Sequence, residues 1–402
     1  MVLHSIMIFA AFFGTTLSAP QTISEWDSWQ TVQADGPWQF LDATSTENGS
    51  VLSLYSREDD GLEAVMVRWL DDSVSVGILP LLEEGAPDWV MGCFLGSGKI
   101  ALFYSSEENS DSVLLRILDP DDLSTVKTVN ITDQLFPGDE AFYELQAIAP
   151  VGESFLQYAA VTAEEGFWEY HLMAGCIDAE GNMHWQDSVG TSQICPGAIH
   201  IWPVGAKCCV LHIIDDHPNY GSIGLEVLRD QGASHCRWSR EYEADFGAGI
   251  QHCSELPDGT ILCAGSHDRA LRENGRLAIL VNLEPTAEEI SNNTYSSDVE
   301  TSFTSILTRP DDSSIILGWT GELEENSYVD YSSRNLILVE RSTSGDLVRE
   351  ILLPHSGSQF PVDLLFKSRN TLAILGRQVP GNGSISDSEL FMGTVHLTTE
   401  MH

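Results

Sequence analysis

The 402-residue sequence is poor in basic residues and has no apolar run long enough to cross a membrane. It holds 19 lysines and arginines, four of them lysines, against 60 aspartates and glutamates, so its formal net charge is −41. Proteins that bind a nucleic-acid backbone need basic patches, which this composition disfavours. A bilayer span needs about 18–20 consecutive apolar residues. The sequence therefore predicts neither a nucleic-acid partner nor a membrane span.

The sequence motifs of common enzyme classes are also absent. It has no P-loop, dinucleotide-binding glycine motif, G-x-S-x-G elbow, H-E-x-x-H helix or EF-hand loop. Its eight cysteines show no C-x₂-C spacing, so no zinc site is indicated. The apolar fraction of 43% suffices for a packed core. We therefore expect a folded protein without a cofactor, although the acidic composition suits divalent cations and leaves calcium open.

The first 18 residues have the features of a secretory signal peptide. Residues 6–13 form an apolar run, and the small residues of a cleavage site follow at 16–19. The stretch before the apolar run contains no lysine or arginine, unlike most signals. We expect cleavage after Ser18 and a secreted or periplasmic protein. The alternative is that this stretch is a buried N-terminal strand.

A turn followed by an apolar strand recurs along the whole chain. Seven turn residues precede these strands at intervals of 49 to 58 residues: Gly49, Gly98, Gly152, Gly205, Gly259, Asp312 and Asn370. Glycine, asparagine and aspartate tolerate a positive φ, which such turns need. A repeat of this period that extends through the chain indicates a solenoid or a propeller.

Each repeat contains four strand-like runs, which is typical of a β-propeller blade. We predict an all-β, seven-bladed β-propeller over residues 20–402, with blades near 36–83, 88–132, 142–190, 196–243, 248–296, 299–354 and 358–399. The last repeat lacks a fourth strand, and residues 23–33 provide a spare one that would close the ring. A pair of β-sandwiches is the alternative, and an even period disfavours it.

With these features the chain resembles secreted seven-bladed β-propellers over residues 20–402. Some turns are similar to quinoprotein-like blades, for example Asp178–Gly181 with Trp185. The resemblance implies a closed ring of sheets that binds ligands on the face where loops enter the first strands, or at the mouth of the central channel.

The loops on that face differ in character. Most loops between second and third strands are acidic, whereas the loops that enter first strands are rich in glycine and aromatic residues. An acidic rim around aromatic rings suits a cationic group. The expected ligand-binding residues are Trp38, Asp88, Trp89, Tyr143, His252, Phe360 and Asp363. The alternative is that the aromatic side chains pack between blades.

A catalytic alternative rests on Asp42, His252 and Asp363. Each lies seven residues before the turn residue of its repeat, so the three side chains are expected to point together toward the channel. Carboxylate and imidazole groups are the usual general acids and bases. Such a site would make the protein an extracellular hydrolase or lyase. Water binding in the channel is the simpler explanation.

Two cysteines flank one of the turns almost symmetrically. Cys253 and Cys263 lie on either side of Pro257–Gly259, so they are candidates for a cross-strand disulfide in an oxidising compartment. The alternative is that they replace core aliphatic residues as free thiols.

Together, these features predict a secreted propeller that acts as a non-catalytic binding module. We expect a monomer. The expected partner is a protein, a glycan or a cationic ligand. The alternative is the hydrolase or lyase at the channel mouth.

Overall fold

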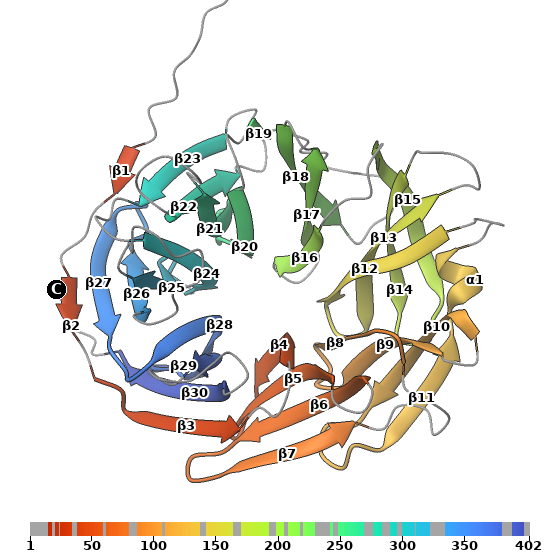
Figure 1. Cartoon of the computed structure of the whole chain (residues 1–402), viewed down its shortest axis with the longest axis horizontal. Coiled ribbons are helices and arrows are strands. Elements are labelled where there is room, and N and C mark those ends of the chain that lie inside the picture. Colours follow the sequence, from red (N-terminus) through yellow and green to blue (C-terminus); the bar gives the residue numbers. More distant parts are fainter. Residues whose placement is uncertain are drawn as a thin grey trace, which may run out of the picture.

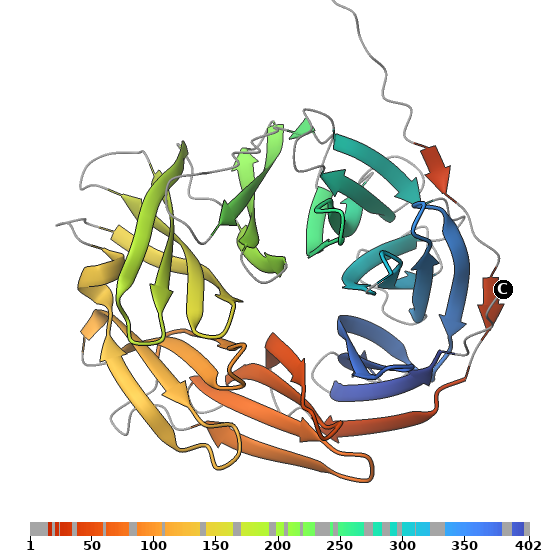
Figure 2. The same cartoon turned by 180° about the vertical axis from the view of Figure 1, so that it is seen from behind.

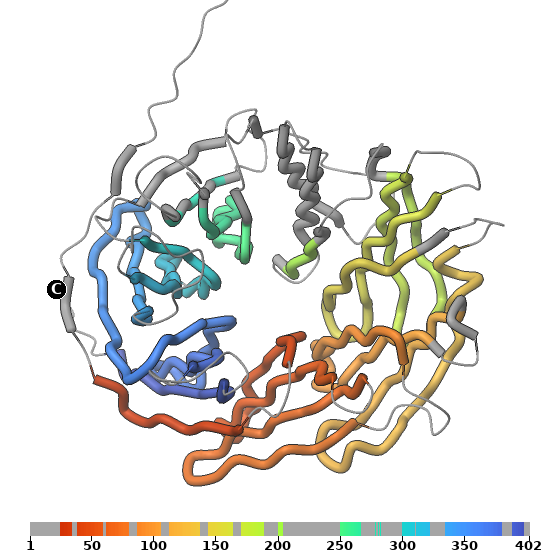
Figure 3. The backbone as a smooth tube through the Cα atoms, in the orientation of Figure 1, coloured from red at the N-terminus to blue at the C-terminus, as the bar shows by residue number. Residues whose placement is uncertain are grey.

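The computed structural model describes most of the repeat region. The described residues are 15–17, 21–23, 25–33, 38–58, 62–79, 87–106, 109–136, 142–163, 170–192, 198–204, 208–217, 220–229, 242–243, 248–268, 276–283, 290–295, 300–309, 311–321, 334–379 and 388–397. Figure 3 follows the backbone through the ring that they form. No helix in these ranges is long and apolar enough to cross a membrane.

The strands within these ranges form seven sheets, the same number as the recurring turns. The first three sheets contain β4 (Trp38–Ser45), β5 (Val51–Glu58), β6 (Leu62–Trp69) and β7 (Val74–Leu79); β8 (Val90–Phe94), β9 (Ile100–Ser106), β10 (Asn109–Leu118) and β11 (Thr125–Asn130); and β12 (Phe142–Val151), β13 (Phe155–Ala163), β14 (Tyr170–Asp178) and β15 (Met183–Ser192).

The fourth to sixth sheets are built in the same way. They contain β16 (Ala198–Val204), β17 (Cys208–His217), β18 (Tyr220–Arg229) and β19 (Tyr242–Glu243); β20 (Ala248–Glu255), β21 (Ile261–Asp268), β22 (Arg276–Leu283) and β23 (Ile290–Tyr295); and β24 (Glu300–Thr308), β25 (Ser314–Gly321), β26 (Asn335–Arg341) and β27 (Leu347–Leu353). The seventh contains β28 (Ser358–Ser368), β29 (Thr371–Val379), β30 (Glu389–His396) and β3 (Ser28–Gln33).

Each sheet is an antiparallel meander, and the sheets stand around a central axis with the first strand of each innermost (Figures 1 and 2). Consecutive strands pair because their connections are short turns. The apolar faces of neighbouring sheets pack against each other, and closure of the ring leaves few exposed sheet edges. The expected all-β propeller class is confirmed.

The N-terminal strand closes the seventh sheet, as the sequence predicts. β3 pairs antiparallel with β30, from Ser28 opposite Thr394 to Gln33 opposite Glu389. Figure 1 shows these two strands, from opposite ends of the chain, side by side. Trp26 packs so closely over Gly393 that any side chain at that position would overlap its indole ring. The two ends of the chain are thus joined by backbone pairing and by close packing.

Two short segments before β3 extend other sheets. β1 (Thr15–Leu17) pairs in parallel with β23, and β2 (Gln21–Ile23) pairs in parallel with β27. Both lie on the outer edges of their sheets (Figure 1). β1 ends one residue before the expected cleavage point at Ser18, and the signal peptide stays a prediction.

The recurring turns have the conformation that their residues predict, with one exception. Gly49, Gly98, Gly152, Gly259 and Asp312 all have a positive φ, between 63° and 85°. Asn370 does not, and its turn has only two residues, since Ser368 pairs directly with Thr371. Gly205 lies outside the described residues. The expectation of a left-handed turn residue is therefore wrong at Asn370.

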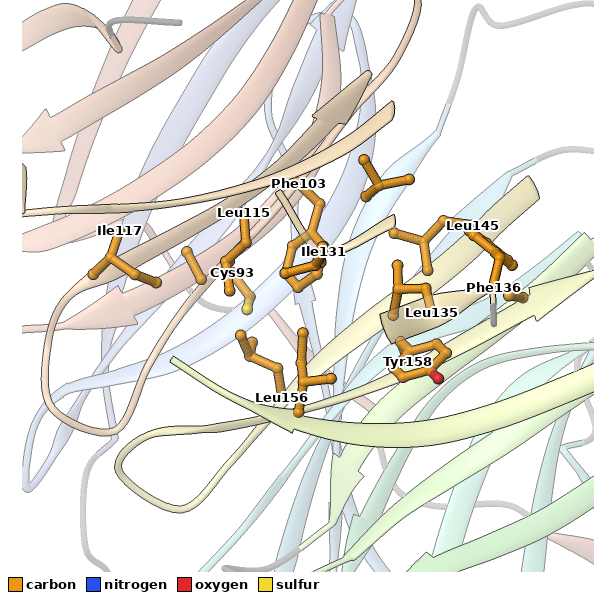
Figure 4. Close-up of a cluster of buried hydrophobic side chains, with 14 of the residues drawn as sticks. Cys93, Phe103, Leu115, Ile117, Ile131, Leu135, Phe136, Leu145, Leu156 and Tyr158 are labelled. Atoms are coloured by element: carbon orange, nitrogen blue, oxygen red, sulfur yellow. The ribbon is translucent and has the colours of Figure 1, made fainter. Parts of the chain in front are cut away.

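The hydrophobic core lies between neighbouring sheets. Figure 4 shows one such cluster, between the second and third sheets, with Phe103 and Leu115 on one side and Leu156 and Tyr158 on the other. The short helix α1 (Thr132–Leu135) covers this cluster, and Leu135 is buried in it. Cys93 lies there as a buried free thiol, so this cysteine occupies a core position.

Candidate ligand-binding cavity and channel residues

Several innermost strands carry a bulge at equivalent positions. The pairing register shifts just before Asp42 in β4, His252 in β20, Ser305 in β24 and Asp363 in β28. A bulge adds one residue to a strand and changes the direction of the side chain beside it. Asp42, His252 and Asp363 are all partly exposed, although their strands are the innermost of their sheets. The bulges therefore set the direction of these polar side chains on the innermost strands, and we call Asp42, His252 and Asp363 the channel residues after their predicted position.

Asp42 connects the first two sheets. Its Oδ1 accepts a hydrogen bond from the backbone N–H of Ala43 at 2.8 Å, and its Oδ2 accepts one from the N–H of Phe94 in β8 at 2.7 Å. Burial in the ring raises the pKa of Asp42 to about 7, and the charge of Asp363 contributes to this rise. The two backbone donors oppose the shift without cancelling it.

Asp363 and His252 bond to β24, which lies between their strands. Asp363 Oδ1 accepts hydrogen bonds from the N–H of Leu364 at 2.8 Å and from Ser305 Oγ at 3.1 Å. Burial raises the pKa of Asp363 to about 6. His252 Nδ1 accepts a hydrogen bond from the N–H of Ile306 at 3.3 Å, which requires an unprotonated Nδ1. Burial lowers the pKa of His252 to about 4.

The candidate catalytic residues are only partly brought together. Asp42 and Asp363 lie on the neighbouring innermost strands β4 and β28, near enough for the charge of one to act on the other. His252 is separated from Asp363 by β24. Among the described residues no hydrogen bond joins any two of the three. Each instead links neighbouring strands, and Asp42 and His252 do so through a backbone N–H.

A cavity of about 310 Å³ opens between the first and last sheets. It is lined by Trp38, Phe40, Tyr55, Phe360, Val362, Gly376, Arg377, Val379 and Leu390. Two of the predicted ligand-binding residues, Trp38 and Phe360, therefore share one cavity. Tyr55 packs edge-on against Trp38 and Phe40, with ring centroids 5.6 and 5.8 Å apart. Aromatic walls of this kind are typical of small-molecule sites.

Arginine side chains lie beside the same aromatic rings. The guanidinium carbon of Arg57 is 5.4 Å from the centre of the Trp38 ring. Arg334 lies 4.9 Å from the Phe360 ring and 3.8 Å from the Trp319 ring. Sequence reasoning missed Tyr55 and Arg377 because they lie in second strands, away from the loops that drew attention in the sequence. Arg334 directly precedes β26, at the end of a loop that the sequence analysis counted among the acidic ones. Because the chain has few basic residues, the position of each arginine was the feature of the sequence that could have indicated this site.

The remaining predicted ligand-binding residues have other surroundings. Asp88 is exposed, and its backbone N–H donates to Ser105 Oγ at 2.9 Å. Trp89 packs against the core cluster of the second and third sheets. The Tyr143 side chain lies outside the described part of the structure, as do most of the acidic loops. The expected acidic rim therefore stays a prediction.

A second, larger cavity of about 880 Å³ lies at the opposite end of the strands, beside the turns at Asn48, Gly98 and Pro120. Its lining is mostly polar and includes Arg68 and Lys99. Arg68 donates to the carbonyl of Pro120 at 2.8 Å and lies 3.6 Å from Asp121. Within the described ranges no three histidine, cysteine or acidic side chains gather as metal ligands.

The cysteine pair is placed as the sequence predicts, but it is not bonded. Cys253 lies directly opposite Cys263 on the antiparallel strands β20 and β21. Their Sγ atoms are 2.9 Å apart, and both thiols are buried and free. A disulfide needs an S–S distance of about 2.05 Å. The structure thus shows the cross-strand neighbours without the expected bond.

Comparisons with known proteins identify the fold. No protein-family model matches the sequence, and no curated protein matches it. The structure is similar to the polysaccharide lyase Uly1, with a TM-score of 0.54, 9% identity, and coverage of 92% of this chain and 99% of that one. It is also similar to acylaminoacyl peptidase from Pyrococcus horikoshii, with a TM-score of 0.50, 13% identity, and coverage of 90% of this chain and 52% of that one.

A third similar structure is the β-propeller domain of the Trilobed protease from Pyrococcus furiosus, with a TM-score of 0.48, 13% identity, and coverage of 96% of both chains. The protein is a β-propeller, on the evidence of seven sheets, each built on a four-stranded antiparallel meander and arranged around a central axis (Figure 1), and of its likeness to the two neighbours with TM-scores of 0.54 and 0.50. At such low identities the neighbours show the fold alone.

Proposed function

We propose that this propeller is a non-catalytic binding module whose ligand site is the cavity between the first and last sheets. The observation that carries the proposal is that Trp38 and Phe360, from opposite ends of the repeat region, line one cavity of about 310 Å³. Small-molecule sites commonly have volumes of about 300–1,000 Å³ and aromatic walls. A closed ring of sheets holds these walls at little ordering cost on binding.

The channel residues support a structural role more than a catalytic one. Asp42 and His252 each accept a backbone N–H from the next sheet, and Asp363 accepts the hydroxyl of Ser305. Such bonds fix neighbouring sheets relative to one another. A hydrolase or lyase is kept as the second candidate function because Asp42 and Asp363 have pKa values raised to about 7 and 6. Carboxyl groups with such values serve as general acids or bases at neutral pH.

A ligand screen with matched variants tests the binding module. Binding of a panel of glycans and small aromatic compounds would be followed by ligand-observed NMR on the wild type, Trp38→Leu and Val126→Ala. Val126 is half exposed on β11, far from the cavity, and serves as the control. We expect ligands that bind the wild type and Val126→Ala and lose affinity for Trp38→Leu. Equal binding to all three proteins, or none to the wild type, would overturn the proposal.

A test for cleavage of the bound compounds distinguishes the hydrolase or lyase from the binding module. The hydrolase or lyase predicts that at least one panel member is cleaved, and that Asp42→Asn abolishes cleavage. The binding module predicts that every bound compound is recovered intact. Recovery of a cleaved product that depends on Asp42 would replace the binding module with the enzyme.

We also propose that residues 1–18 are a signal peptide and that the mature protein is secreted or periplasmic as a monomer. The support is the apolar run at 6–13 followed by small residues at 16–19. N-terminal sequencing of the protein recovered outside the cytoplasm should start at Ala19. A chain recovered with Met1 intact would contradict cleavage. Sedimentation of the mature protein should give a mass of one chain.

A further inference from the structure

Arginine side chains lie in and beside the cavity, in a protein that has few basic residues. Arg377 lines the cavity, and Arg57 and Arg334 lie against the rings of Trp38 and Phe360. The whole chain has 19 basic residues against 60 acidic ones. The protein's own guanidinium groups thus already make cation–π contacts with the aromatic rings that the sequence assigned to a cationic ligand. A second cation brought to the same place would be repelled.

Arg57 and Arg377 differ in how their charge is balanced. Arg57 forms an ion pair with Glu63, so its charge is locally neutralised. Arg377 donates from Nε to Ser388 Oγ at 2.6 Å, and among the described residues no carboxylate forms an ion pair with it. Glu389 is next to Leu390, a lining residue of β30, and side chains of adjacent strand residues point to opposite faces. Of the charged side chains that the structure describes, Arg377 therefore lines the cavity without a carboxylate partner.

Tyr55 contributes its aromatic ring to the cavity wall. It packs edge-on against Trp38 and Phe40, its side chain is only 2% exposed, and its hydroxyl lies beside Ser53 with almost no accessible surface. Among the residues that line the cavity, Arg377 carries the charged group.

We propose that the cavity binds a small carboxylate with a planar apolar body. This inference rests on the proposed function and adds the chemical class of the ligand. The apolar body would lie among Trp38, Phe40 and Phe360, and the carboxylate would accept hydrogen bonds from the guanidinium of Arg377. A guanidinium binds a carboxylate through parallel N–H groups, which a neutral amide or an amine cannot accept in the same way.

Three probes of nearly equal shape test the charge of the ligand. Phenylacetate, phenylacetamide and 2-phenylethylamine differ chiefly in being anionic, neutral and cationic. Affinities for the full-length protein would be measured by saturation-transfer NMR and calorimetry at low and high salt. We expect phenylacetate to bind about tenfold more tightly than phenylacetamide, with the amine weakest, because one charge-assisted pair is worth roughly that factor. High salt should reduce the difference in affinity between phenylacetate and phenylacetamide.

Variants assign the preference to Arg377. Arg377→Gln should lose the preference for phenylacetate and keep its affinity for phenylacetamide, whereas Arg377→Lys should keep part of the preference because it keeps the charge. Arg116→Gln is the matched control, since Arg116 bonds to Thr128 on another sheet. Thermal unfolding would show that each variant is folded. If Arg377→Gln does not fold, Arg377→Lys and the salt dependence still test whether Arg377 causes the preference for phenylacetate.

The outcomes separate this inference from the proposed function. If the amine or the amide binds best and Trp38→Leu abolishes its binding, the cavity is a ligand site but the carboxylate class is wrong. If phenylacetate binds best in the wild type and equally well in Arg377→Gln, the assignment to Arg377 is wrong. If no probe binds and the glycan panel is also negative, both proposals fail.

Discussion

The indole ring of Trp29 lies flat on the ring of Phe391, with centroids 4.3 Å apart and planes 14° from parallel. The imidazole of His355 stacks against the same indole, with centroids 3.9 Å apart. Trp29 comes from the first strand of the ring and Phe391 from the last. This stack therefore adds side-chain packing to the backbone pairing that joins the two ends of the chain.

Truncation of this indole should weaken ring closure. We expect Trp29→Ala to lower the free energy of unfolding by about 3 kcal/mol, because removal of a large packed aromatic side chain costs about 3–5 kcal/mol and Trp29 is only partly buried. Urea unfolding followed by circular dichroism measures the change. Val348→Ala, at a half-exposed position of β27, should change the free energy little. Equal midpoints for the two variants would show that the stack does not hold the ring.

The carboxyl group of Asp42 should make stability fall as pH rises. Its pKa is about 7 in the folded protein against 3.8 in the reference state, so the folded state holds more protons between these values. The contribution of Asp42 to the free energy of unfolding is complete below pH 3.8 and is lost as the pH rises through 7. In Asp42→Asn the free energy of unfolding should therefore fall by about 1–2 kcal/mol less over this pH range than in the wild type. The figure is reduced because solvent reaches the partly exposed side chain.

Urea midpoints at pH 5 and pH 8 measure this effect for the wild type and Asp42→Asn. The variant loses one acceptor for the backbone N–H of Ala43 or Phe94, so the informative quantity is the change between the two pH values. Asp88→Asn, at an exposed position, is the control and should follow the wild type. An identical pH response of wild type and Asp42→Asn would contradict the raised pKa.

His252 should make the stability of the protein fall as the pH is lowered, which is the opposite of the effect of Asp42. Its pKa is lowered to about 4 from 6.5, so the unfolded state takes up a proton first as the pH falls. Its contribution is full above pH 6.5 and is lost as pH falls through 4. His252→Gln should lose about 1–2 kcal/mol less than the wild type between pH 7 and pH 4.5. His396→Gln, an exposed control, should behave as the wild type in the same unfolding experiment.

The thiols of Cys253 and Cys263 should become a disulfide when the protein folds in an oxidising compartment. They are cross-strand neighbours with Sγ atoms 2.9 Å apart, and closing so short a loop would add roughly 2 kcal/mol. Peptide mapping of the secreted protein under non-reducing conditions should find the two cysteines linked. Cytoplasmic protein should show free thiols that alkylate slowly, because burial raises the pKa of Cys253 well above its usual value. Free thiols in the secreted protein would contradict the linkage.

The strand order was predictable because the sequence repeats it. A turn residue with positive φ at Gly49 or Gly259 needs no distant contact to form, and the alternation of apolar residues after it marks the buried face. The spare N-terminal strand was predictable because the last repeat lacked one. Asn370 was misread because the length of a turn depends on the register of both its strands.

The candidate site was only half predictable. Trp38 and Phe360 were found as aromatic residues expected in loops that enter first strands, and the structure places both inside those strands, β4 and β28. Nothing in the sequence shows that Arg377 and Tyr55 line the same cavity. The bulges before Asp42 and Asp363 are likewise a matter of register, and register depends on how the sheets pack. The bonds of Asp42 and His252 to the next sheets form only between segments about 50 residues apart in the chain.

The sequence by itself determined the strands, their turns and the order in which they pair, because these depend on local backbone preference and on the alternation of apolar residues. The tertiary structure alone decided which charges meet the aromatic rings. A chain with net charge −41 gives every reason to expect a cationic ligand. Only closure of the ring brings Arg377 of one sheet to Trp38 of another, and the sign of a binding site depends on the charges that share its walls.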